Sequence, residues 1–198
     1  MNMNPRTFGV ALALSLSLAA AYPALAQEYD ETAVMAAYEK AMTPGEHHAK
    51  LAELVGTWAM TVTQWMQPGA EPSVTTATST SKMIMGGRYM LDTVEGTAMG
   101  MPFTGTGWTG YDNVDERYEA TWIDNFGTGI YTYHGQWDDD VNGIVMHGSF
   151  TDPVTGEKVE LKTVTRLEGP DKMVYTSYER RKGDKEGRKT LEIVSIRQ

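Results

Sequence analysis

The chain has 198 residues, no cysteine and a formal net charge of −9. This length fits one domain with a buried core, and the acidic balance argues against nucleic acid and anionic membrane surfaces as partners. Without cysteine, neither a disulfide nor thiol chemistry is available.

The first 26 residues have the pattern of a secretory signal peptide. Arg6 precedes an apolar run over residues 8–22, and the small-residue triplet Ala24-Leu25-Ala26 follows. The run is shorter than the roughly 20 residues that a membrane-spanning helix needs. We therefore predict cleavage after Ala26 and a periplasmic or secreted protein without a membrane span. Residues 27–198 then carry a formal charge of −10.

Residues 27–55 are predicted to be a helical segment. The spacing of apolar residues predicts a helix over residues 31–42, which Pro44-Gly45 ends. Its apolar face carries Val34, Ala37, Tyr38 and Ala41. A second helical turn is expected over residues 48–54.

From Gly56 onward the apolar residues alternate with period two, and turn residues interrupt the pattern about every ten residues. The predicted strands are 57–66, 73–85, 88–95, 102–111, 117–124, 129–137, 143–151, 158–168, 172–181 and 188–197. No helical segment separates them, so each strand should pair antiparallel with the next. Residues 56–198 are therefore expected to form one all-β domain, closed into a barrel that leaves no free edge.

The glycines of Gly105-x-Gly107-x-x-Gly110 have the spacing of a dinucleotide-binding turn, but that motif needs a helix directly after it. Strand-like sequence continues here instead. If the following turn is residues 113–116, Gly107 lies opposite Trp122 and Gly105 opposite Asp124. Both glycines then face the barrel interior, where they leave room for an aromatic ring, whereas Gly110 faces outward.

The segment Leu54-Val55-Gly56-Thr57-Trp58 resembles the opening of lipocalins, fatty-acid-binding proteins and nitrobindins, barrels in which the Trp closes one end. An ordered set of motifs resembles a bacterial domain-of-unknown-function family, number 1579, over about residues 46–197. The motifs are Gly86-Gly87-Arg88-Tyr89, Gly100-Met101-Pro102-Phe103, Gly110-Tyr111-Asp112-Asn113, Thr121-Trp122-Ile123-Asp124-Asn125 and Thr151-Asp152-Pro153-Val154-Thr155-Gly156. The resemblance implies a lipocalin-like, or calycin-like, barrel and no established reaction. Nitrobindin-like barrels hold haem through a histidine near the C-terminus. No histidine follows His147 here, although His47 or His48 could substitute from the barrel mouth, and no cofactor is predicted.

An aromatic interior predicts that the barrel binds or carries a small hydrophobic or aromatic molecule. The candidate ligand-binding residues are Trp58, Tyr89, Phe103, Gly105, Gly107, Tyr118, Trp122, Tyr131, Tyr133 and Trp137. Arg88 and Asp124 are candidate polar contacts. Two alternatives stay open: an enzyme that uses the same cavity, and a structural or interaction protein with a filled barrel. A monomer or weak homodimer is expected.

Other motifs give no site. Glu46-His47-His48 is poor material for a metal centre, and Asp138–Gly143 lacks the glutamate that completes a calcium loop. The methionine pairs Met83-x-Met85 and Met99-x-Met101 are interpreted as core residues of a strand face rather than copper ligands. The chain has no G-x-S-x-G motif, no nucleophilic cysteine and no H-E-x-x-H motif, so no catalytic residue and no metal ligand is assigned.

Overall fold

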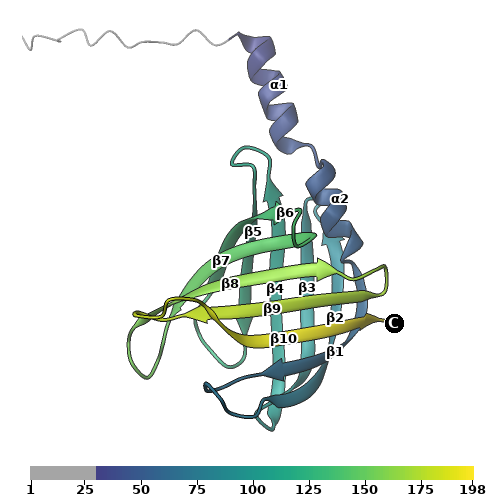
Figure 1. Ribbon diagram of the computed structural model, residues 1–198. Coiled ribbons are helices and arrows are strands. Elements are labelled where there is room, and N and C mark those ends of the chain that lie inside the picture. The colour runs from purple at the N-terminus through teal and green to yellow at the C-terminus, as the bar shows by residue number, and fades with distance from the viewer. Residues whose placement is uncertain (1–29) are drawn as a thin grey trace, which may run out of the picture.

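The computed structural model describes residues 30–198, which form a closed barrel of ten antiparallel strands preceded by two helices (Figure 1). The helices are α1 (Glu31–Met42) and α2 (Glu46–Glu53). The strands are β1 (Gly56–Gln64), β2 (Ser73–Ile84), β3 (Tyr89–Ala98), β4 (Met101–Asp112), β5 (Arg117–Asp124), β6 (Tyr131–Asp138), β7 (Gly143–Thr151), β8 (Lys158–Leu167), β9 (Lys172–Arg180) and β10 (Arg188–Arg197). Each strand pairs with the next along the chain, and β1 closes the ring by pairing with β10. The predicted all-β barrel is confirmed.

Strand β3 runs further than its sequence suggests, because Gly96 continues the strand instead of ending it. A Cβ at Gly96 would lie 2.6 Å from the Cβ of Ala77 on β2, so the glycine permits a close approach of two strands. The chain then reverses in a two-residue turn, Met99-Gly100, where φ is 50° and 74°. Positive φ at both residues is typical of the hairpin turn that matches the strand twist.

The hairpin of β4 and β5 has the predicted register. Gly107 lies opposite Trp122, and Gly105 lies opposite Asp124. The alternation continues into β6, where Tyr131 lies opposite Trp122. We call the space that the inward-facing side chains enclose the lumen.

Helix α2 covers one end of the barrel, which we call the plug end (Figure 1). The opposite end, which we call the open end, carries the loops 65–72, 125–130, 152–157 and 181–187. The interstrand turns at the plug end are short, and two of them hold the chain between the helices. The Asn113 side chain donates to the Thr43 carbonyl at 2.8 Å, and Arg88 donates to the Met42 carbonyl at 2.6 Å.

Helix α1 extends away from the barrel and buries no residue (Figure 1). Its bounds are those predicted, and Asp30 caps it by accepting a hydrogen bond from the Thr32 amide at 3.0 Å. None of the helices in residues 30–198 is long and apolar enough to cross a membrane. The predicted signal peptide, residues 1–26, lies outside the described residues.

The interpretation of the methionine pairs as core residues is wrong for three of the four. Met83 packs against the buried cluster, but Met85, Met99 and Met101 are exposed. Met85 and Met99 have positive φ in turns, so neither continues the strand face of its partner. A two-residue spacing indicates one strand face only while the strand lasts.

Candidate functional site

Trp58 closes the plug end of the barrel, as its G-x-W context implies. Its side chain is 0% exposed, and its Nε1 donates to the Leu54 carbonyl at 3.0 Å. The Arg197 guanidinium lies 4.1 Å from the centre of the ring and also donates to the Val55 and Glu53 carbonyls. These contacts tie α2, β1 and β10 together, so Trp58 has a structural role and lies away from the open end.

Helix α2 inserts apolar side chains into the plug end. Leu51 and Leu54 are buried with Tyr118, Ile144 and Met146 in one cluster. His47 lies above them, where its ring stacks on Tyr111 at 4.0 Å between centroids and its Nδ1 is 3.0 Å from the Tyr118 hydroxyl. Burial is the main reason that the pKa of Tyr118 lies above its ordinary value, and the nearby Tyr111 and Glu46 raise this pKa further. Tyr118 therefore stays neutral and belongs to the plug.

His48 fixes the start of α2. Its Nδ1 accepts a hydrogen bond from the Gly45 amide at 3.0 Å, and its side chain is buried. Burial lowers the pKa of His48, and the adjacent His47 and Arg88 lower it further against a hydrogen bond that involves Tyr111. Only the neutral imidazole has a free Nδ1 acceptor, so the folded state favours unprotonated His48.

Lowering the pH is expected to destabilise helix α2. Because the folded-state pKa of His48 lies below the unfolded value of 6.5, its contribution to stability is complete above pH 6.5 and falls as pH drops through the folded pKa. Hydrogen exchange of the α2 amides, measured between pH 7.5 and pH 5 and corrected for intrinsic rates, should show this loss of protection.

His48→Asn is the control, since asparagine keeps an acceptor near the position of Nδ1 but does not titrate. The variant should show a flat protection profile over the same range. A pH step of equal size in His48→Asn would assign the effect to another group.

Beyond the plug, the inward-facing side chains differ in how far they are buried. Several of them keep partial exposure, among them Val62, Ala77, Asp92, Trp122, Tyr131, Tyr133 and Tyr175. Others on the same inward face, such as Met60, Val159 and Ser195, are buried. The cluster under α2 is buried by contrast. Close-packed interiors leave their side chains without exposure, so the partial exposure indicates space beside these particular side chains.

Trp122 lies over the two lumen glycines. A Cβ added at Gly105 would collide with the far edge of the Trp122 ring, and one at Gly107 would lie 3.1 Å from Trp122 Cε3. The indole Nε1 donates to Asp124 Oδ2 at 2.9 Å, and Asp124 Oδ1 accepts from the Phe126 amide at 2.9 Å. Gly105, Gly107, Trp122 and Asp124 thus form one patch of the lumen wall, as predicted.

Three tyrosines line the lumen beside this patch. Burial is the first cause of the raised pKa of Tyr131, and the carboxylates of Asp124 and Glu179 add to it. Burial raises the pKa of Tyr133 as well, and it raises the pKa of Tyr175 to about 12. Their hydroxyls are therefore neutral near pH 7, able to donate or to accept hydrogen bonds.

Asp92 is a lumen residue that the sequence analysis missed. It lies opposite Gly107 and Ser81, and its Oδ1 accepts hydrogen bonds from the hydroxyls of Ser79 and Ser81 at 2.6 and 2.7 Å. Burial raises the pKa of Asp92, and these hydroxyl bonds oppose the rise. Its placement follows from alternation once the register of β4 is carried across to β3.

At the open end, an ion pair joins two loops. Arg181 donates to Asp152 Oδ2 at 2.6 Å, and Asp152 Oδ1 accepts from the amides of Val154 and Thr155. The Arg181 bond is the main reason that the pKa of Asp152 falls to about 2. A hollow of about 580 Å³ lies at the rim, lined by Met99, Met101, Pro102, Asn125 and Phe126.

The structure divides the predicted site residues into groups. Six line the lumen: Phe103, Gly105, Gly107, Trp122, Tyr131 and Tyr133. Trp58, Tyr118 and Trp137 belong to the plug, where the Lys50 ammonium lies 4.1 Å from the Trp137 ring centre.

Two predicted residues lie outside the lumen. Tyr89 is 46% exposed on the outer face, where it covers Gly110. This placement corrects its assignment to the ligand-binding residues. Side chains alternate along β3, and the next residue, Met90, is the one that faces inward. Arg88 is exposed in the turn before β3, and it donates to the carbonyls of Met85 in the same turn and of Met42 at the end of α1.

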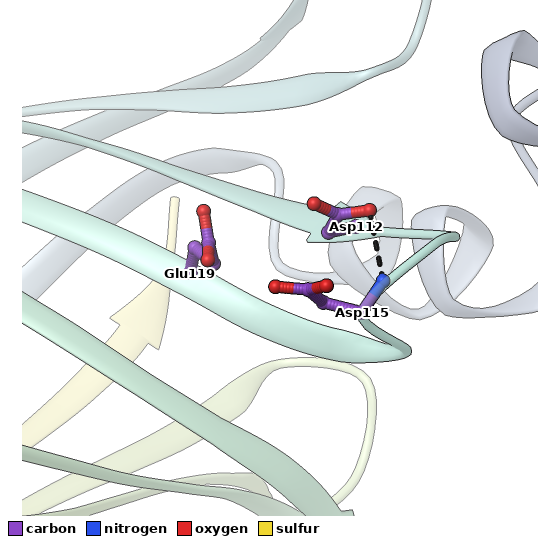
Figure 2. Close-up of side chains that lie close together, drawn as sticks. All are labelled: Asp112, Asp115 and Glu119. Carbon is purple, nitrogen blue, oxygen red and sulfur yellow. Dashed lines mark hydrogen bonds between the residues drawn. The ribbon is translucent and has the colours of Figure 1, made fainter. Parts of the chain in front are cut away.

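The carboxylates of an acidic cluster on the outer surface are bound by a neighbouring arginine and by backbone amides. Carboxylate oxygens of Asp112, Asp115 and Glu119 lie within 4.8 Å of one another (Figure 2). Arg117 bonds Asp115 at 3.0 Å and Glu119 at 2.7 Å. The Asp112 carboxylate accepts from the Asp115 amide, the dashed line of Figure 2, and from the Val114 amide. The cluster stabilises the turn between β4 and β5, and a metal would have to displace Arg117.

Neither of the other histidine or aspartate motifs forms a ligand site. Asp138 to Asn142 make the turn between β6 and β7, in which Asp138 Oδ1 accepts from the Asp140 amide at 2.9 Å. His47 and His48 are held in the plug by Tyr118, Tyr111 and Gly45, and His134 and His147 face outward.

Comparisons with known proteins agree with this barrel. Rv2717c from M. tuberculosis is a solved structure with 20% identity and a TM-score of 0.58, and the match covers 79% of this chain and 99% of that chain. The S-type phycobiliprotein lyase CPES from Guillardia theta has 10% identity and a TM-score of 0.54, with 81% and 96% covered. At these identities the likeness shows the fold.

No curated protein matches the sequence. A family model described as a protein of unknown function, DUF1579, matches residues 43–197, from the end of α1 through β10. The matched range contains the plug, the lumen and the open end. The chain therefore belongs to the DUF1579 family of proteins of unknown function.

Proposed function

We propose that this protein is exported and that it binds or carries a small apolar or aromatic molecule in its lumen. The observation that carries the proposal is the partial exposure of side chains that point inward, such as Trp122 and Tyr175. If the barrel were filled, these side chains would be as buried as Leu51 and Tyr118 in the plug.

The chemistry of the wall suits an organic ligand. Rings of Phe103, Trp122 and Tyr133 offer flat apolar surface, and the tyrosine hydroxyls offer a few polar contacts. Within residues 30–198, the hydroxyls of Tyr131 and Tyr133 have no hydrogen-bond partner. They are nevertheless not sealed from solvent, because Thr121 Oγ1 is the one fully buried side-chain polar atom in that range that lacks a partner. The tyrosine hydroxyls therefore reach space that water or a ligand can occupy.

The two ends of the barrel favour entry from one side. Helix α2 and Trp58 close the plug end. The open end carries the exposed apolar side chains of Met99, Met101 and Phe126 around a hollow. Exposed apolar surface beside a cavity is typical of a binding-site entrance.

Native mass spectrometry of the protein purified from its own host tests the proposal. The expected result is an added mass of a small molecule that dissociates when the protein is unfolded. The proposal would be wrong if no mass is added and the refolded protein also fails to bind N-phenyl-1-naphthylamine, an uncharged fluorescent probe.

A further inference from the structure

Two carboxylates flank the aromatic patch of the lumen and have no cationic partner. Asp92 lies across Gly107 from Trp122, and Asp124 lies two residues after Trp122 on the same face of β5. Neither takes part in any of the ion pairs found within residues 30–198, from Lys40–Glu116 to Arg197–Asp171. Carboxylates inside a protein are normally paired with a positive charge, so this patch lacks its counter-charge.

The cations at inward positions lie at the two rims. Arg197 is held at the plug end over Trp58. Arg188 lies opposite Glu179 at the open end, where Arg181 also approaches Glu179 at 3.5 Å. The inward faces of β3 to β6 therefore carry two carboxyl groups and aromatic rings, and no basic side chain.

Asp124 is held in a fixed orientation. Two N–H donors, Trp122 Nε1 and the Phe126 amide, bind its two oxygens at 2.9 Å each. Because both oxygens are already held in place, a ligand that binds this carboxylate pays no further ordering cost. The indole ring that supplies one donor also presents a π-face, which attracts cations, most strongly in the case of tryptophan.

We infer that the lumen takes an organic cation, an ammonium or amidinium group on an apolar or aromatic body, with the cation placed between Asp92, Asp124 and the Trp122 ring. This inference rests on the proposed binding function and specifies its ligand class. An anionic ligand would be placed against two carboxyl groups, and a neutral ligand would leave both without a cationic partner.

Three probes of one shape test the charge preference: 1-naphthylmethylamine as the cation, 1-naphthylmethanol as the neutral body and 1-naphthoate as the anion. Calorimetric titrations at pH 7.5 and low salt should give a dissociation constant for the amine that is about tenfold lower than for the alcohol, the size expected for one charge-assisted contact. The naphthoate should bind more weakly than the alcohol.

The variants Asp124→Asn and Asp92→Asn should each lower the ratio of the affinity for the amine to the affinity for the alcohol. Asp115→Asn removes an equal charge from the outer surface, where Asp115 pairs with Arg117, and should keep the full preference. Far-UV circular dichroism confirms that each variant is folded.

If the alcohol or the naphthoate binds as tightly as the amine, the inference is overturned while lumen binding stands. If none of the three binds and N-phenyl-1-naphthylamine does not bind either, both the inference and the proposed function are wrong. If Asp115→Asn lost the preference for the amine as much as Asp92→Asn and Asp124→Asn do, the preference would arise from the net charge of the protein. That result would also overturn the inference.

Discussion

Replacing Trp58 with alanine is expected to lower the free energy of unfolding by about 3–5 kcal/mol. The side chain is 0% exposed, so its removal leaves a cavity that the rigid ends of β1 and β10 cannot close. The Leu54 carbonyl also loses its donor, and the Arg197 guanidinium loses the ring below it. Urea unfolding followed by far-UV circular dichroism measures the change.

Two further variants separate burial from the mere loss of a tryptophan. Trp108→Ala removes the same side chain from the outer face, where it is 44% exposed, and should cost well under half as much. Trp58→Phe keeps most of the volume and loses the bond to Leu54, at a cost of about 1–2 kcal/mol. A Trp58→Ala effect no larger than that of Trp108→Ala would contradict the structural role of Trp58.

Replacing Gly107 with alanine is expected to destabilise the barrel by about 3 kcal/mol. The added Cβ would collide with the backbone carbonyl of Thr121 on β5 and would lie 3.1 Å from the Trp122 ring. A backbone atom in a paired strand cannot move aside without breaking the ladder. The midpoint of urea unfolding should therefore fall clearly.

Gly129→Ala is the matched control, because no atom lies within 4 Å of a Cβ at that loop position. Its unfolding midpoint should stay close to that of the wild type. Gly105→Ala should have an intermediate effect, since the atom in its way is the far edge of the Trp122 side chain, which can shift. Equal midpoints for Gly107→Ala and Gly129→Ala would refute the close packing of β4 and β5.

The barrel could be predicted from the sequence because strands and turns are marked by residues that lie close together along the chain. Period-two alternation and turn residues located β5, β7 and β10 with the observed bounds. One hairpin turn, residues 113–116, was enough to place Gly105 and Gly107 inward, since a strand alternates strictly between two faces. Gly96 was misjudged as a strand end, because the tight approach to Ala77 depends on a neighbour that precedes it by nineteen residues.

The candidate site was predictable only in part, because it depends on position along the barrel axis as well as on the face. Phe103, Trp122 and Tyr133 face the lumen as expected, but Trp58, Tyr118 and Trp137 face inward at the level where α2 fills the space. Alternation cannot tell these levels apart. Asp92 was within reach of the same register argument, carried one strand further back to β3.

Ligand binding inside the lumen can be tested directly by comparing two variants of β1. Val62 points inward and is partly exposed, whereas the neighbouring Thr61 points outward and is exposed. Val62→Phe adds a ring to the lumen, and Thr61→Phe adds one to the outer surface. Fluorescence titration with N-phenyl-1-naphthylamine measures the affinity of each.

If the probe binds in the lumen, Thr61→Phe should bind it like the wild type, and Val62→Phe should bind it at least about tenfold more weakly, a loss of roughly 1.4 kcal/mol. Both variants should unfold at similar urea concentrations, which shows that the difference arises in binding. Equal affinity of the two variants would contradict the account, because the probe would then be bound outside the barrel.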